Sequence, residues 1–206
     1  MTSTFHDGSR RLQDRFDTRA LADRIDDLLV SDTISEGDRA FIVARDMFFL
    51  ATADAEGRPT CSFKGGEPGF VRVLDEHTVA FPSWDGNGMY LSAGNVLVNG
   101  DVGMLFIDLG KGHRMRLDGR ATIDLDDPLR GEWPEAQLVV RVRARAVYPN
   151  CPRYIHRYEL VERSRFVPRE DCLTPVPEWK RSDWAADALP AHDPARDPGD
   201  REILGR

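Results

Sequence analysis

Long apolar runs are missing from this sequence of 206 residues. The longest are short stretches such as MFFLAT and QLVV, whereas a helix that crosses a bilayer needs about 20 apolar residues. The N-terminal stretch MTSTFHDGSRRLQDRF also lacks the apolar segment of a secretory signal. We therefore expect a cytoplasmic protein without a membrane partner.

Cysteine is scarce, and the common catalytic and metal-binding motifs are absent. Cys61, Cys151 and Cys172 are odd in number and show no CxxC spacing, which favours reduced thiols over disulfides or a zinc site. The five histidines are scattered without an HExxH motif, so we predict no metal site. Neither a GxxxxGK[ST] phosphate loop nor a GxSxG nucleophile elbow occurs.

The chain also has no excess of positive charge. It holds 28 Lys and Arg against 35 Asp and Glu, a net charge of -7. Binding to a phosphate backbone requires clustered cations without compensating acids, so we expect no nucleic-acid partner. The length fits one domain with terminal additions.

The pattern of apolar residues divides the chain into three parts. Residues 1–46 form a helical segment that we expect to pack on the sheet, and Ser35 with Asp38 resembles a capping box at the start of its last helix. Residues 47–167 alternate with a period of two, which predicts a small antiparallel barrel and a mainly β (α+β) fold. Residues 168–206 are rich in Pro and Asp, which predicts an extended C-terminal arm that is partly disordered.

Several short strands are expected within the central part. MFFLATADAEGRPTCSF is typical of a hairpin with its turn at Glu56 and Gly57. The further predicted strands are GFVRVL, TVAFP, VLVNGDVGMLFID, HRMRLDGRATI and EAQLVVRVRARAVYP.

The stretch AFPSWDGNGMYLSAGN interrupts these strands with Gly and Asn residues. Such residues allow positive φ angles and let successive backbone amides converge on an anion. GMYLSAGN could form a helical turn whose N-terminus favours a phosphate. A simple hairpin connection explains the same composition, so both interpretations stay open.

Three basic residues lie where a barrel could use them. Lys64 ends the strand PTCSFKGG, so it is either a solvated side chain or a cation at the mouth of the barrel. Arg114 and Arg116 alternate with apolar residues and leave the same face of one strand, which is equally consistent with a solvent-exposed face.

The ordered segments from FFLATADAEGRPTCSFKGG through RMRLDGRA to YPNCPRYIHRY resemble the flavin-binding split-barrel family of pyridoxamine 5'-phosphate oxidase. The resemblance covers roughly residues 40–160. It implies a six-stranded antiparallel split β-barrel and a homodimer. It also implies one FMN in each of two clefts at the subunit interface. The glycine loop would then bend around the flavin and its phosphate.

The resemblance also assigns residues to the cofactor. Ser62 and Lys64 match basic and hydroxyl groups that face FMN, and Pro82 with Ser83 resembles the pair that lies along the flavin. Arg114 matches a polar side chain sent from the sheet to the flavin, with Arg116 as its neighbour on the same face.

The phosphate contacts depart from the family pattern. Where the oxidase carries an Arg-Lys pair, this chain has Asn87, Gly88 and Met89 in a longer loop. The phosphate would therefore depend on backbone amides, Asn95, Lys64 or an Arg of the other subunit. The backbone amides and Asn95 would be neutral contacts, which are weaker than charge-assisted ones.

Two classes of function follow from the resemblance. The first is an FMN-dependent oxidoreductase that acts on a small-molecule substrate by two-electron flavin chemistry; a deazaflavin-dependent reductase is a variant of it. The second is a non-catalytic protein of the same fold that binds flavin or haem.

Overall fold

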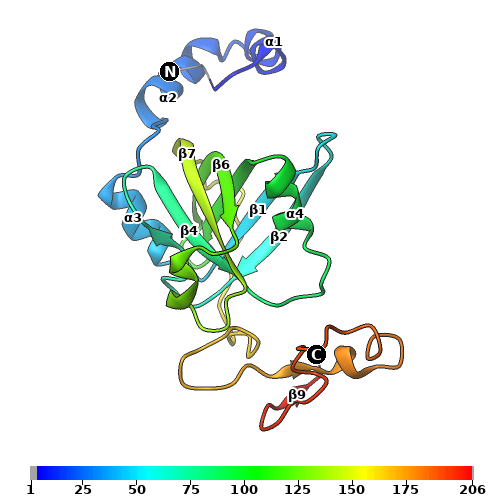
Figure 1. Ribbon diagram of the computed structural model, residues 1–206. Coiled ribbons are helices and arrows are strands. Elements are labelled where there is room, and N and C mark those ends of the chain that lie inside the picture. Colours follow the sequence, from blue (N-terminus) through cyan, green and yellow to red (C-terminus); the bar gives the residue numbers. More distant parts are fainter. Residues whose placement is uncertain (1–3, 206) are drawn as a thin grey trace.

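The protein is described by a computed structural model for residues 4–205. Figure 1 shows a strongly curved sheet with helices at one end and a long C-terminal arm at the other. The helices are α1 (Asp7–Arg15), α2 (Arg19–Leu29), α3 (Glu36–Val43) and α4 (Leu91–Val98), with 3-10 turns η1 (Pro128–Glu132) and η2 (Glu178–Arg181). The strands are β1 (Met47–Ala53), β2 (Pro59–Gly65), β3 (Arg72–Val73), β4 (Thr78–Ser83), β5 (Asp101–Asp108), β6 (His113–Asp124), β7 (Leu138–Asn150), β8 (Val176–Pro177) and β9 (Ile203–Leu204).

The main sheet is antiparallel and has seven strands in the order β2-β1-β5-β6-β7-β4-β3. The mainly β class with helices is confirmed, but the expected number of six strands is wrong. The seventh strand is β3, in which only Arg72 and Val73 pair with β4. The rest of the predicted strand GFVRVL does not pair, and its Phe70 and Val71 are buried in the core instead.

The predicted hairpin is present. Strands β1 and β2 pair from Met47↔Gly65 to Ala53↔Pro59. Gly57 in the connecting turn has a φ of 79°, a conformation that glycine adopts without the steric cost of a side chain.

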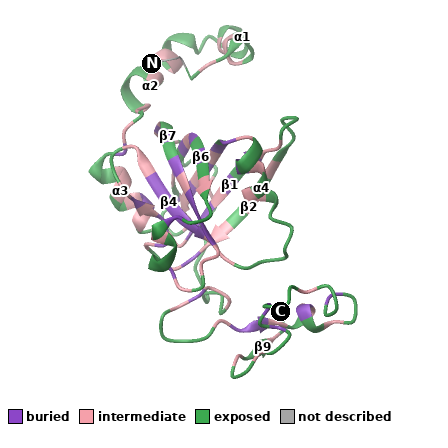
Figure 2. Cartoon of the chain, in the orientation of Figure 1, coloured by how far each residue is buried: buried purple, intermediate pink, exposed green. Residues whose placement is uncertain are grey.

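The core lies inside the curve of the sheet. Phe48 is completely buried, and its ring contacts those of Phe70, Phe81 and Phe106 at centroid distances of 5.8, 5.0 and 5.2 Å. Such aromatic pairs contribute about 0.5–1.5 kcal/mol each beyond the area they bury. In Figure 2 the buried residues accordingly concentrate on the strands of the barrel.

The N-terminal helices differ in how they relate to the sheet. The predicted capping box is present at α3, because Ser35 accepts from the Asp38 amide and Asp38 accepts in return from the Ser35 amide. No side chain of α1 or α2, both fully described, is buried in the single chain. These two helices stand away from the barrel in Figure 1.

Helix α4 replaces part of a predicted strand. The run Val96–Val98 was expected to begin a long strand, but these residues form the last turn of α4, and β5 starts only at Asp101. Val96 is buried, whereas Leu97 and Val98 are exposed, which is the burial pattern of one helical turn on a sheet. Three consecutive apolar residues fit both periods, so their spacing alone does not separate helix from strand.

The C-terminal arm, residues 168–205, has little regular structure but a defined path. Strands β8 and β9 form a two-residue parallel pair, Val176↔Ile203 and Pro177↔Leu204. Lys180 in η2 is only 3% exposed and forms ion pairs with Asp193 in the arm and Asp85 in the glycine loop. The arm is therefore joined to the barrel next to that loop.

Candidate functional site

The polar side chains of β2 point into the barrel. Directly paired residues of antiparallel strands share a face of the sheet, and Lys64 pairs with the buried Phe48 while Ser62 pairs with the buried Leu50. The open end of the barrel between β2 and β4 therefore receives one cation and one hydroxyl.

A small cavity lies at this open end. It has a volume of about 20 Å³, roughly the space of one water molecule. Lys64 from β2, Pro82 and Ser83 from β4, and Ser92 from α4 line it together with apolar residues. The hydroxyls of Ser62 and Ser92 lie 2.8 Å apart and hold α4 against β2. The structure thus brings together four of the residues assigned from sequence: Ser62, Lys64, Pro82 and Ser83.

Lys64 is a partly buried cation without an acceptor. Burial lowers the pKa of its ammonium group, because the charged form loses hydration. No carboxylate or carbonyl among residues 4–205 accepts a hydrogen bond from it. A bound anion would supply the missing partner.

The glycine loop forms a turn that leads into α4. Asn87 accepts a hydrogen bond from the Met89 amide at 3.1 Å, and Gly88 has a φ of 73°. Tyr90, the residue before α4, has a φ of 49° and provides no side-chain cap. The amides of the first helical turn therefore have no side-chain acceptor and lie beside the cavity that Ser92 and Lys64 share.

The side chain of Asn95 is engaged within the fold by two hydroxyl groups. Its amide nitrogen donates to the hydroxyl of Thr52 at 3.0 Å and to that of Thr60 at 3.3 Å. These bonds fix α4 on the β1–β2 hairpin.

Arg114 and Arg116 lie on the opposite face of the sheet from Lys64. Their β5 partners are Ile107 and Leu105, whereas the row that contains Lys64 continues through Phe48 and Phe106 to Met115. Arg114 donates to the carbonyl of Cys151 at 3.0 Å. Within one chain these two arginines do not meet the other assigned residues.

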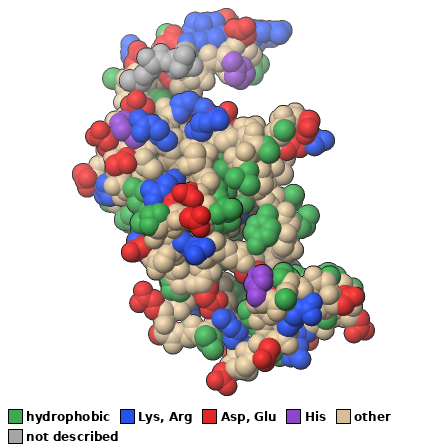
Figure 3. Space-filling model, in the orientation of Figure 1, with side chains coloured by type: hydrophobic (Ala, Val, Ile, Leu, Met, Phe, Trp, Pro, Cys, Tyr) green, Lys and Arg blue, Asp and Glu red, His purple; other side chains and the backbone are tan. Residues whose placement is uncertain are grey.

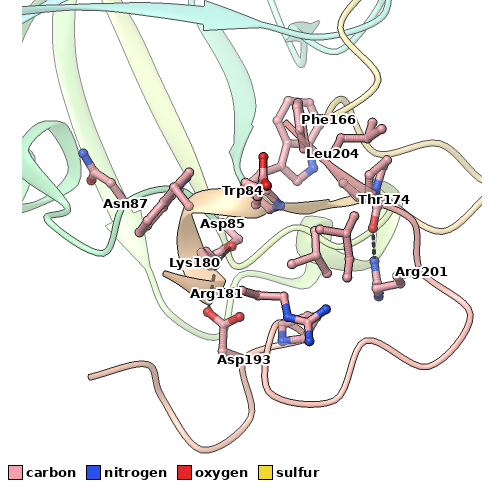
Figure 4. Close-up of a pocket in the computed structure, with 18 of the residues that line it drawn as sticks. Trp84, Asp85, Asn87, Phe166, Thr174, Lys180, Arg181, Asp193, Arg201 and Leu204 are labelled. Atoms are coloured by element: carbon pink, nitrogen blue, oxygen red, sulfur yellow. Dashed lines mark hydrogen bonds and ion pairs between the residues drawn. The ribbon is translucent and has the colours of Figure 1, made fainter. Parts of the chain in front are cut away.

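A much larger hollow of about 1430 Å³ separates the barrel mouth from the arm (Figure 4). We call its two sides the barrel wall (Ser62, Lys64, Trp84, Gly86 and Asn87) and the arm wall (Glu178, Trp179, Arg181 and Trp184). Lys64 lines both the hollow and the small cavity, so the two spaces adjoin.

One buried and one half-exposed ion pair, both made by Lys180, hold the two walls in place. Asp193 is 8% exposed, and its Oδ2 lies 2.8 Å from Nζ of Lys180. Burial alone would raise the pKa of Asp193, but the hydrogen bonds from Lys180 and the Ala195 amide, with the charge of Lys180, hold it below its usual value. On the barrel side, Trp84 is fixed by a 2.9 Å bond to the Pro134 carbonyl.

Sequence reasoning assigned no role to the residues on the arm wall. Trp179 and Trp184 stand out in EWKRSDW, but nothing in a single sequence shows that Lys180 pairs with Asp85, 95 positions away. Ser92 was not assigned to the site either, although the segment GMYLSAGN that contains it was considered as a helical turn beside a phosphate.

Clusters of potential metal ligands and helices able to span a membrane are both absent from the described residues. No group of three or more His, Cys, Asp or Glu side chains in residues 4–205 could hold a metal ion. None of the described helices is long and apolar enough to cross a membrane. On the face shown in Figure 3, acidic and basic side chains are interspersed.

Comparisons with known proteins bear on the fold and the family of the chain. No curated protein matches the chain. Among solved structures, HupZ from Group A Streptococcus is 18% identical (TM-score 0.46, 56% of this chain and 93% of that chain). An FMN-binding protein from Syntrophomonas wolfei is 13% identical (TM-score 0.42, 68% and 97%). HutZ, the heme storage protein from Vibrio cholerae, is 18% identical (TM-score 0.42, 56% and 94%).

The family itself is shown by a sequence model. The model for pyridoxamine 5'-phosphate oxidase matches residues 34–171, which include β1 to β7, α4 and the glycine loop. The chain therefore belongs to the pyridoxamine 5'-phosphate oxidase family, whose fold is the split barrel.

Proposed function

We propose that the protein is an FMN-dependent oxidoreductase that binds the flavin on the barrel wall. The observation that carries this proposal is Lys64, a partly buried cation without an acceptor in the described structure. The hydroxyls of Ser62, Ser83 and Ser92 and the uncapped start of α4 surround the same opening. This set of donors fits the phosphate of FMN.

The shape of the site limits where the flavin ring can lie. A cavity of about 20 Å³ does not hold a ring system, whereas the adjoining hollow of about 1430 Å³ does. The ring would lie against Trp84 and the glycine loop, with Lys64 between the two spaces. FMN supplies two-electron chemistry when bound; this chain's residues would bind it, orient it and place a positive charge beside it.

The proposal includes a homodimer. The outer face of the sheet carries Phe63, 63% exposed, whose ring packs edge-on against Phe49 at 5.9 Å. Leu105 is only half-buried on the same face. A second copy placed on this face would cover it. Because Arg114 and Arg116 point outward there, in this proposal they act on the flavin of the second copy.

A haem-binding function is less well supported by the lining of the hollow. Haem iron is held by a His, Cys, Met or Tyr side chain, and none of these lines the hollow in the described part of the chain. A purified protein with a haem absorption band would reverse this preference.

Titration of the flavin-free protein with FMN tests the proposal. We expect binding, and we expect Lys64→Ala to weaken it by about 1.5–3 kcal/mol because a charged group loses its partner. Lys111→Ala is the matched control, since Lys111 is an exposed lysine in the β5–β6 turn. Absence of any heat of binding or spectral change with FMN would refute the proposal. If the protein bound a deazaflavin and not FMN, the cofactor would be a deazaflavin. Reduction of the bound flavin by NADH or NADPH, followed by reoxidation, would separate an enzyme from a carrier.

A further inference from the structure

The arm wall carries recognition groups that the flavin proposal does not use. Trp179 and Trp184 stack with their ring centroids 5.6 Å apart and their planes 10° apart. Trp184 is nevertheless 72% exposed, so one face of this indole remains open to a second ring. Bases stack on exposed aromatic rings with little regard to sequence, because every base has a π face.

Three of the acidic side chains that line the hollow pair with other cations, whereas the guanidinium group of Arg181 on the arm wall is unpaired in the described structure. Asp85 and Asp193 are both paired with Lys180, and Glu135 is paired with Arg201 at 3.1 Å. Arg181 has no acidic or carbonyl partner among residues 4–205, and Figure 4 shows it beside the pair formed by Lys180 and Asp193. A free guanidinium binds phosphate oxygens in a bidentate manner.

Glu178 lies on the same side of η2 as Arg181, because residues three apart are eclipsed in a 3-10 helix. No ion pair joins the two in the described structure. A carboxylate next to a phosphate site is suited to accept hydrogen bonds from ribose hydroxyls.

The size of the hollow leaves room for a second molecule. Pockets for one small ligand measure roughly 300–1,000 Å³, and this hollow measures about 1430 Å³. The barrel wall and the arm wall face it from opposite sides (Figure 4).

We propose that the arm wall binds the adenosine diphosphate part of a nucleotide, with the diphosphate on Arg181, a ribose on Glu178 and the base on Trp184. The assignment of this nucleotide as an electron donor of the NADH type rests on the proposed flavin function. The binding site itself does not, since it lies entirely on the arm.

The test uses ADP-ribose and the full-length flavin-free protein, with titration calorimetry and tryptophan fluorescence as readouts. We expect ADP-ribose to bind and to quench the emission of the Trp179–Trp184 pair. Arg181→Gln should weaken binding about tenfold or more. Arg143→Gln is the matched control, because Arg143 is an exposed arginine on β7 that has no ion pair in the described structure and does not line the hollow. It should bind as the unmodified protein does.

A second pair of variants tests stacking. Trp184→Ala should weaken binding about tenfold, whereas Trp184→Phe should retain most of it. Far-UV circular dichroism confirms that each variant is folded. No binding of ADP-ribose to the unmodified protein at millimolar concentration would overturn the site, as would equal affinities for the Arg181→Gln and Arg143→Gln proteins.

The outcomes separate this site from the flavin proposal. If ADP-ribose binds but FMN does not, the nucleotide site stands and its role as a donor site falls. If FMN binds but ADP-ribose does not, the nucleotide site falls and the flavin function stands.

Discussion

Lys180 forms an ion pair with Asp85, a residue 95 positions earlier, and thereby joins the C-terminal arm to the glycine loop. Lys180 also pairs with the buried Asp193, so a single ammonium group holds two parts of the arm and one part of the barrel together. The geometry of the hollow depends on this group.

Replacing Lys180 by Met should therefore release the arm. The change leaves the carboxylate of Asp193 buried without its cation, and breaking a buried pair typically costs about 3–5 kcal/mol; partial exposure of Asp85 places our expectation at the lower end. Limited proteolysis should then cleave the arm faster while β1 to β7 stay protected. Lys111→Met is the control, and equal cleavage of the two variants would contradict the role assigned to Lys180.

The attachment of the arm should also depend on pH. The folded-state pKa of Asp193 lies below its unfolded value of about 3.9. Its contribution to stability is therefore fully present above about pH 4 and is lost as the pH falls through the lowered pKa. Fluorescence of the Trp179–Trp184 pair, measured from pH 7 to pH 2, should change in this acidic range. In Asp193→Asn the acidic transition should shift or disappear; the same transition in both proteins would assign it to other groups.

Lys64 should reduce the stability of the flavin-free protein. Its folded-state pKa is lowered by burial, so the folded state binds fewer protons than the unfolded state between the two pKa values, and stability rises with pH there. Lys64→Met removes the buried charge and should raise the thermal midpoint. The gain in the free energy of unfolding should be less than about 1 kcal/mol, because part of the side chain still reaches water. The same variant should bind FMN more weakly. A lower midpoint for Lys64→Met would show that the ammonium has a stabilising partner.

The proposed homodimer can be tested at Phe63. Placing a carboxylate at the centre of an apolar interface is costly, so Phe63→Asp should shift the protein to monomers in light scattering on a size-exclusion peak. Leu125→Asp is the control, since Leu125 is similarly exposed, at 65%, and lies beyond the end of β6. A monomeric unmodified protein that binds FMN fully would contradict the shared cleft.

Much of the fold follows from local sequence signals. The hairpin at Gly57 and the capping box at Ser35 each depend on residues within a few positions of one another, and both are confirmed. Helix α4 was only half anticipated: GMYLSAGN was considered as a helical turn, but Val96–Val98 was assigned to a strand. The helix is held by bonds from Asn95 to Thr52 and Thr60 on the hairpin, and such tertiary contacts override local preference.

Only the site residues whose orientation depends on strand alternation could be predicted from the sequence. Ser62 and Lys64 share a face because strand side chains alternate, and that alternation is visible in PTCSFKG. The resemblance assigned both Lys64 and Arg114 to the flavin, and the structure places them on opposite faces of the sheet, which the sequence does not show. The arm wall depends on pairings over long distances in sequence, which a single chain does not reveal.

The parallel pairing of Val176 with Ile203 has a consequence for the order of synthesis. Because the ribosome makes the chain from its N-terminus, strands β1 to β7 and the barrel wall are complete before residues 203–204 emerge. The arm wall can therefore be completed only after every residue of the barrel wall has been synthesised. A cofactor that bound before the arm was in place would meet Lys64 at an open barrel mouth, whereas in the full chain it would have to enter a hollow that the arm wall also lines.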